Sequence, residues 1–83
     1  MNKLEILLLK MMEVNDYTSA YKSITTYDLS QMENFWLKDD TIYRYLRKLA
    51  KDDYLSYGLQ EGKRKTFYIT QKGIKKLEEY KDV

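Results

Sequence analysis

The sequence predicts an α+β fold, because two hydrophobic periods occur along the chain. Apolar residues recur with the helical period of about 3.6 in residues 3–14, 39–51 and 71–80, and they alternate in the stretches 54–59 and 65–70. A chain of 83 residues with 43% hydrophobic and 14% aromatic residues can bury one modest core. We therefore expect residues 1–83 to form a single domain.

The first helix is expected over Lys3 to Val14, and it carries apolar residues on more than one side. Leu4, Leu7, Leu8 and Met11 share one face, and Ile6, Leu9 and Met12 lie on another. Two interpretations remain open. Either the helix is central and surrounded by the rest of a small core, or its second face packs against a partner subunit.

A second helix is expected after a loop over residues 15–23 and a short strand near Ile24. Thr25, followed three positions later by Asp28, resembles a capping box. This signal predicts a helix over Thr26 to Glu33 that buries Leu29 and Met32. The next segment, Asn34 to Lys38, is expected to be a turn whose apolar residues plug a corner of the core, namely Phe35, Trp36 and Leu37.

A third helix is predicted over Asp39 to Lys51. Its apolar residues share one face, which comprises Ile42, Tyr45, Leu46 and Leu49. Asp39 and Asp40 place carboxylates in the first turn, where they favour the helix dipole.

A hairpin and a last helix complete the expected order. Leu55, Tyr57 and Leu59 alternate with small residues in the first strand, and Phe67 and Ile69 share a face of the second. Polar residues 60–64 connect the two strands, and Thr70 can cap a helix over Gln71 to Tyr80 that turns Ile74 and Leu77 inward. This order predicts a winged helix-turn-helix: a three-helix core, a two- to three-stranded antiparallel β-wing and a short C-terminal helix.

The composition excludes several classes of function. The chain has no Cys and no His, which removes disulfides, thiolate or imidazole metal sites and His-dependent catalytic triads. We expect no catalytic residue, no metal and no cofactor, and hence no enzyme. The longest apolar run, Ile6 to Leu9, is far shorter than a membrane span of about 18 residues, so a soluble, cytoplasmic protein with no membrane partner is expected.

The positive charge is concentrated in the part of the chain that contains the third helix and the hairpin. Residues 1–37 carry a net charge of −2, whereas residues 38–76 carry eleven Lys or Arg against five acids. The predicted DNA-contacting residues are Lys38, Tyr43, Arg44, Arg47, Lys48, Lys51, Lys63, Arg64 and Lys65. This distribution favours double-stranded DNA as the partner.

The two elements carry different weight in this prediction. On the third helix, Arg44 and Arg47 are candidates to contact bases, while Lys48 and Lys51 are expected to hold the backbone; Tyr43 either packs on the flank or contacts DNA. A charged helix face is also ordinary solvated surface. The basic triplet 63–65 beside Gly62 is stronger evidence for DNA contact, because a hairpin tip can fold without three consecutive cations.

Two stretches resemble PadR-type transcriptional regulators. Thr41, Ile42, Tyr43, Leu46 and Leu49 are similar to the recognition helix Thr-Leu-Tyr-x-x-Leu-x-x-Leu of that family. Lys65, Phe67, Ile69, Thr70 and Gly73 are similar to its wing strand and exit, Lys-x-Tyr-x-Leu-Thr-x-x-Gly, and the Thr-x-x-Gly exit also occurs in MarR-type regulators. Together the matches span about Leu37 to Leu77, nearly half the chain.

The resemblance implies a dimeric bacterial repressor with helix 39–51 in the major groove and the 60–65 wing on the backbone or minor groove. The sequence departs from the family at Asp53, where Gly is usual, and in the first helix, which lacks the Gly-Tyr continuation. The long C-terminal dimerisation helix is expected to be missing. A homodimer would then use the first helix and the short last helix.

Two functions compete at this point. The first is a sequence-specific DNA-binding transcriptional regulator, a repressor that is nucleoid-associated when bound. The second is a winged-helix module for protein–protein interaction without DNA binding, which Asp39, Asp40 and the extra apolar face of the first helix would suit.

Overall fold

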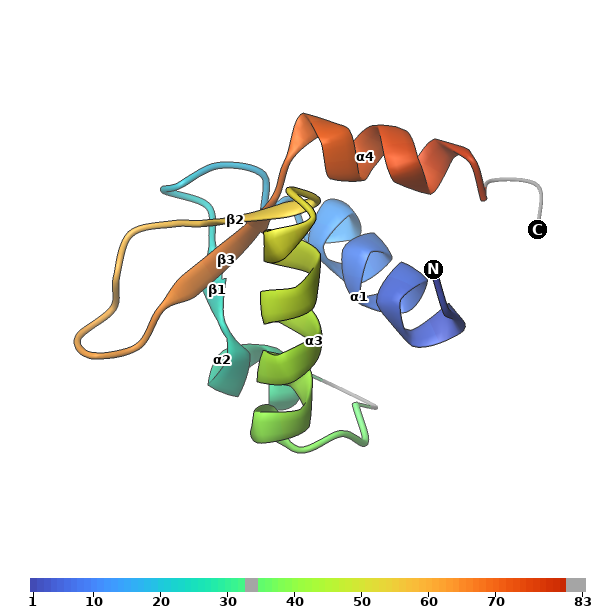
Figure 1. The fold of residues 1–83 in the computed structure, drawn as a ribbon. Helices are drawn as coiled ribbons and strands as arrows, with labels where there is room; N and C mark the ends of the chain where they lie inside the picture. Colours follow the sequence, from blue (N-terminus) through green and yellow to red (C-terminus); the bar gives the residue numbers. More distant parts are fainter. Residues whose placement is uncertain (33–34, 81–83) are drawn as a thin grey trace.

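The computed structural model describes residues 1–32 and 35–80, and it has the α+β fold that the sequence predicts (Figure 1). The elements follow in the expected order: α1 (Lys3–Val14), β1 (Ile24–Thr25), α2 (Thr26–Ser30), α3 (Asp39–Lys51), β2 (Leu55–Tyr57), β3 (Thr66–Ile69) and α4 (Gln71–Glu78). The bounds of α1 and α3 are those predicted from the hydrophobic period.

The three strands form one antiparallel sheet in the order β1-β3-β2. In the central strand, Phe67 lies opposite Ile24 of β1 on one side and Tyr57 of β2 on the other. The connection between β2 and β3 extends away from the helices as an arm, which we call the wing (residues 58–65; Figure 1). At its tip, Glu61 and Arg64 exchange two backbone hydrogen bonds of 2.9 Å, and Gly62 between them has a φ of 61° that favours glycine.

The core lies where α1, α3 and the sheet meet. Its fully buried members include Leu8, Leu9 and Met12 of α1, Leu29 of α2, Ile42, Leu46 and Leu49 of α3, and Leu55, Phe67 and Ile69 of the sheet. Leu77 of α4, which packs against α1, closes one end of this core. The buried face of α3 therefore fixes which of its residues remain exposed.

Each of three helices begins at a residue whose side chain accepts a hydrogen bond from a free backbone N–H. Thr25 and Thr70 cap α2 and α4 as predicted, accepting from the N–H groups of Asp28 and Gly73 at 3.1 Å. The reciprocal capping box lies at α1, where Asn2 accepts from the N–H of Glu5 and Glu5 accepts from the N–H of Asn2. This capping box was not predicted from the sequence.

The turn after α3 contains a residue in the left-handed region. Asp53 has a φ of 64°, its N–H donates to the carbonyl of Ala50 at 3.0 Å, and its own carbonyl accepts from the hydroxyl of Thr70 at 2.6 Å. Aspartate is among the few residues other than glycine that tolerate this conformation. The departure from the PadR pattern at this position therefore preserves the turn.

Of the two interpretations left open for α1, the structure supports the central helix, because Leu9 on its second face is fully buried by the chain's own core. Two other expectations about apolar residues are wrong. Trp36 is 71% exposed, because the flanking Phe35 and Leu37 fill the corner and the indole only stacks on Phe35. Leu59 is 55% exposed, because the chain has already left the core for the wing.

Helix α2 and helix α4 are shorter than predicted. Helix α2 ends at Ser30, and the predicted end at Glu33 lies outside the described residues, as does Asn34 at the start of the expected turn. Helix α4 ends at Glu78, followed by a turn that includes Tyr80. Among the residues described, no helix has the length and apolar character needed to cross a membrane.

Candidate nucleic-acid interface

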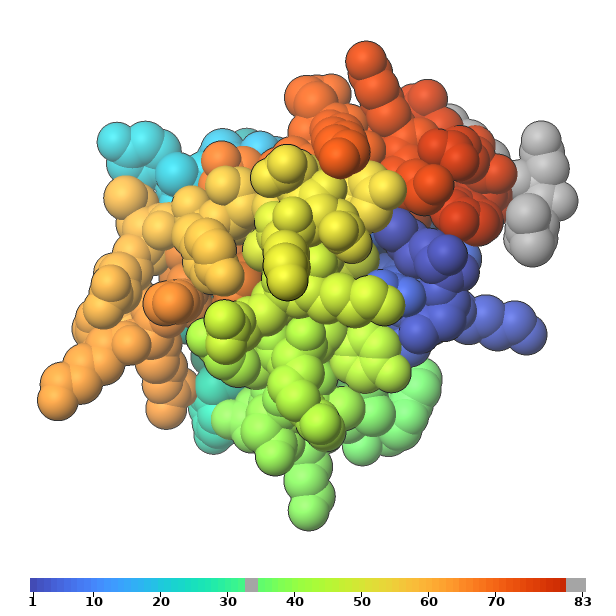
Figure 2. Space-filling view, viewed as in Figure 1, coloured from blue at the N-terminus to red at the C-terminus, as the bar shows by residue number. Residues whose placement is uncertain are grey.

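The face of α3 opposite the core is exposed and basic. Ile42, Leu46 and Leu49 are fully buried, so the helical period turns Arg44, Arg47 and Lys51 outward, as the sequence predicts. In the space-filling view this helix occupies the middle of the visible surface, with the wing beside it (Figure 2). The two elements thus contribute to one continuous side of the molecule.

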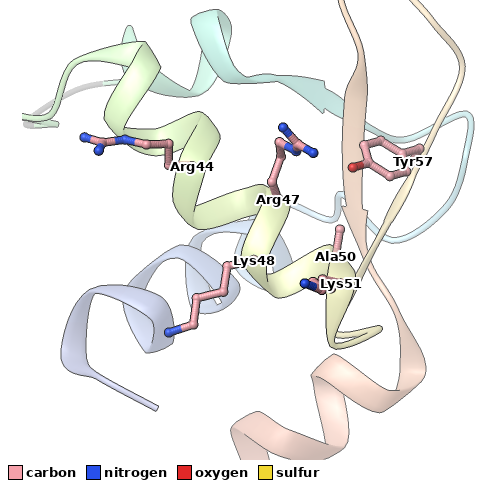
Figure 3. Close-up of a pocket in the computed structure, with 6 residues that line it drawn as sticks. All are labelled: Arg44, Arg47, Lys48, Ala50, Lys51 and Tyr57. Atoms are coloured by element: carbon pink, nitrogen blue, oxygen red, sulfur yellow. The ribbon is translucent and has the colours of Figure 1, made fainter.

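A shallow groove runs between α3 and the hairpin (Figure 3). It is lined by Arg44, Arg47, Lys48, Ala50, Lys51 and Tyr57. Arg47 extends across it toward Tyr57, whereas Lys48 extends away toward α1 (Figure 3). Arg44, Arg47 and Lys51 beside one open groove form a surface suited to a polyanion.

Tyr43 connects the exposed face of α3 to the core. Its ring makes an edge-to-face contact with Phe67, with 6.1 Å between ring centroids, and it is half-buried. The guanidinium of Arg47 lies over the same ring at 5.7 Å from its centroid. Packing on the flank is therefore the observed role of Tyr43, and the Tyr43 ring supports Arg47 through a cation–π contact.

The three cations at the wing are placed individually. The guanidinium of Arg64 lies over the ring of Tyr27 in α2, 4.7 Å from its centroid, and the ammonium of Lys65 lies 5.3 Å from the centroid of Tyr57. Lys63, at the tip, is exposed. The role of Tyr27 was not predicted, because nothing in its surroundings along the chain indicates a contact with Arg64.

Lys48, which the sequence predicts to hold the DNA backbone, forms an ion pair within the molecule. Its ammonium nitrogen lies 3.2 Å from Oε2 of Glu5 in α1, and the Glu5 side chain is only 6% exposed. The burial of Glu5 alone would raise the pKa of its carboxyl group, but the hydrogen bond from the Asn2 backbone and the nearby Lys48 ammonium outweigh this effect and lower the pKa. Glu5 is therefore a paired carboxylate at neutral pH.

The pairing of Glu5 predicts a pH-dependent contribution to stability. A lowered pKa in the folded state stabilises the fold above the ordinary glutamate value of 4.5, and this stabilisation is lost as the pH falls through the folded pKa. At pH 7, Glu5→Gln should lower the free energy of unfolding by about 1 kcal/mol, since Gln keeps the cap but loses the charged pair. Urea unfolding of both proteins between pH 7 and pH 3 measures this difference.

The difference between the two proteins should shrink toward zero at the acidic end of that range. Glu78→Gln is the matched control, because Glu78 is exposed on α4 and makes no ion pair with any described residue. A difference for Glu5→Gln that stayed constant down to pH 3 would contradict the assignment.

At the start of α3, carboxylates lie in the first turn, as the sequence predicts. Lys38 is the exposed N-cap residue and provides no side-chain cap. Asp39 and Asp40 lie in the first turn, and Oδ1 of Asp40 accepts from the N–H of Thr41 at 2.8 Å. These carboxylates stabilise the N-terminus of α3 through the helix dipole. In residues 1–32 and 35–80, no three carboxylates gather closely enough to hold a metal ion.

The fold and this surface together define a winged-helix protein, and solved structures agree. TubR from Bacillus megaterium pBM400 superposes with a TM-score of 0.79 at 15% identity, covering 100% of this chain and 89% of that one. A PadR-like transcriptional regulator from Bacillus cereus superposes with a TM-score of 0.65 at 23% identity, covering 94% and 77% of the two chains. The resemblance to PadR-type regulators is thus confirmed in the fold.

A sequence relative identifies the family. The DNA-binding protein TubR of a Clostridium botulinum C phage is 37% identical over 76 residues, which make up 92% of this chain and 91% of that protein. The chain belongs to the TubR family. Comparison with models of known protein families gives no match.

Proposed function

We propose that this protein is a sequence-specific, double-stranded DNA-binding transcriptional regulator, with residues 1–83 acting as one winged-helix DNA-binding domain. The observation that carries the proposal is that the exposed basic face of α3 lines a groove beside the hairpin, and that the wing, which carries Lys63, Arg64 and Lys65, lies next to α3 on the same side of the molecule (Figure 2). The name of the 37% identical relative, a DNA-binding protein, supports the same function. The comparisons give no support to a protein-interaction module or an enzyme.

Helix α3 is the proposed element in the major groove. The groove of B-DNA admits one α-helix, and an arginine there can donate two hydrogen bonds to guanine. Arg44 and Arg47 have this chemistry and face outward, and the Tyr43 ring limits the conformations of Arg47. Lys51 and Lys38, exposed at opposite ends of α3, are suited to flanking phosphates.

The wing is the proposed second contact, on the phosphate backbone or in the minor groove. Lys63, Arg64 and Lys65 follow Gly62, and all three are exposed. Because Tyr27 and Tyr57 hold Arg64 and Lys65 by their ring faces, these two cations are partly ordered before DNA binds. Ordering in advance lowers the entropic cost of the contact.

We further propose a homodimer that represses transcription, in the cytoplasm and at the nucleoid when DNA-bound. The apolar residues left exposed on α1 are Leu7, at 36%, and Val14, at 69%, and they lie on the same side of the helix. This stripe, extended by α4, is the proposed interface. Dimers of such domains bind two half-sites related by the symmetry of the protein.

Selection of bound duplexes from a random pool tests the proposal. The expected result is a family of related sequences containing an inverted repeat, whose affinity falls steeply as salt is raised. Recovery of unrelated sequences would contradict sequence specificity. The absence of any bound duplex at low salt would contradict DNA binding itself.

Arg47→Ala is expected to relax sequence preference. Loss of a bidentate contact with guanine should reduce the ratio of affinities for the selected duplex and a scrambled duplex by about 5- to 150-fold. Fluorescence anisotropy with both duplexes measures the ratio. Lys75→Ala, which removes one exposed charge from α4, is the control and should leave the ratio unchanged. An unchanged ratio for Arg47→Ala would remove Arg47 from the base-contacting set.

A further inference from the structure

We propose that the ion pair with Glu5 of α1 keeps Lys48 from contacting DNA. The pair positions α3 and determines how many of its cations contact phosphate. This inference rests on the proposed DNA-binding function. It divides the lysines of α3 into one that is bound internally, Lys48, and one that contacts phosphate, Lys51. By sequence alone the two lysines were equivalent.

The first observation is the setting of the Glu5 carboxylate. Its Oε1 accepts the backbone N–H of Asn2 at 2.9 Å, and its Oε2 lies 3.2 Å from the ammonium of Lys48. Both oxygens are therefore used, and the side chain is only 6% exposed. A carboxylate in this position needs a cationic partner, because water has little access to it.

The second observation is the asymmetry between the two partners. Lys48 is 62% exposed along its side chain, so it could reach solvent and, in an unpaired state, an anion beside α3. Moving its ammonium to phosphate would leave the buried Glu5 carboxylate without a partner. Breaking a pair of this kind costs more than an exposed lysine gains at a phosphate, so the pair is expected to persist when DNA binds.

The third observation is the direction of the side chain. Lys48 lines the groove at its stem, but its ammonium extends toward α1 and away from the side of the groove formed by Tyr57 (Figure 3). Lys51, about one turn further along α3, is exposed and makes no ion pair with the described residues. Lys51 is therefore the matched comparison for Lys48.

Salt dependence of DNA affinity distinguishes a phosphate contact from an internal pair. The logarithm of the affinity falls with the logarithm of the salt concentration with a slope of about −0.9 for each phosphate that the protein neutralises. A residue that only stabilises the fold does not change this slope. We therefore compare Lys48→Met, Lys51→Met, Glu5→Gln and the double variant Glu5→Gln with Lys48→Met on one selected duplex.

The inference makes a distinct prediction for each variant. Lys51→Met should make the slope shallower by about 0.9, and Lys48→Met should leave it at the wild-type value. Glu5→Gln should free Lys48, steepen the slope by about 0.9 and raise affinity at low salt roughly three- to tenfold. Adding Lys48→Met to Glu5→Gln should return both quantities to wild type.

Two results would overturn the inference. If Lys48→Met made the slope shallower by as much as Lys51→Met does, Lys48 would be a phosphate contact. If Glu5→Gln changed stability alone and left the slope at the wild-type value, Glu5 would not control Lys48. Failure of the wild-type protein to show salt-dependent binding would instead overturn the proposed function, and this inference with it.

Lysine acetylation of the wild-type protein provides a test that needs no substitution. Acetylation rates are measured by mass spectrometry with and without the duplex, under conditions in which the protein stays folded. DNA is expected to slow the acetylation of Lys51 and to leave that of Lys48 unchanged. Equal protection of both lysines would contradict the inference, even if a variant failed to fold.

Discussion

Phe67→Ala is expected to lower the free energy of unfolding by about 3–5 kcal/mol, the range for removal of a fully buried aromatic side chain. Phe67 is 0% exposed and occupies the central strand, between Ile24 and Tyr57. Its ring also contacts Tyr43 of α3 and Tyr57 of β2, with centroid separations of 6.1 Å and 5.0 Å. The Phe67 ring thus packs α3 against the hairpin.

Urea unfolding followed by circular dichroism measures this effect. Domains of this size have free energies of unfolding of about 4–12 kcal/mol. The variant is therefore expected to lose a large part of its stability and to bind DNA only at low temperature. Phe67→Leu, which keeps most of the apolar volume, is the control and should cost less than half as much. A loss below about 1 kcal/mol for Phe67→Ala would contradict the central position assigned to this ring.

Lys63→Ala combined with Arg64→Ala is expected to weaken binding to every duplex by about 100-fold at 0.1 M salt, since each lost phosphate contact costs roughly tenfold under these conditions. Both side chains are exposed at the wing. The affinity ratio between selected and scrambled duplexes should change little, in contrast to Arg47→Ala, because phosphate contacts carry no base identity. Anisotropy titrations over a range of salt concentrations measure both quantities.

A control with the same change in net charge shows whether the wing acts locally. Lys75→Ala with Lys76→Ala removes two cations from α4, where Lys76 pairs with Glu79 at 3.3 Å. If the proposed surface is correct, this variant should lose only a few-fold in affinity. Equal losses for the two double variants would show that overall charge, rather than the wing, determines binding.

The sequence predicted the elements that have an uninterrupted hydrophobic period. The bounds of α1 and α3 follow directly from that period, and Thr70 marks the start of α4. In the turn before α3 there is no period, so nothing in the sequence distinguishes the exposed Trp36 from the half-buried Phe35 and Leu37. Chain segments that leave the core, such as the one containing Leu59, are equally hard to identify from alternation alone.

In the candidate site, too, local features could be predicted from the sequence and contacts between distant segments could not. Helical spacing correctly predicted that Arg44, Arg47 and Lys51 are exposed. Contacts between distant parts of the chain could not be predicted, as for Lys48 with Glu5 and Arg64 with Tyr27. A weak signal existed in the first case: an acidic residue within the most apolar helix suggests a buried charge in need of a partner.

A nuclear magnetic resonance titration of the ¹⁵N-labelled protein with the selected duplex tests whether DNA binds to α3 and the wing. The proposed interface predicts that the largest shift changes occur at Arg44, Arg47 and Lys51 of α3 and at residues 61–65 of the wing. The outer face of α1, at Lys10 and Val14, should change little upon addition of DNA to a preformed dimer. Changes confined to α1 and α4, or no changes at all, would contradict DNA binding through α3 and the wing.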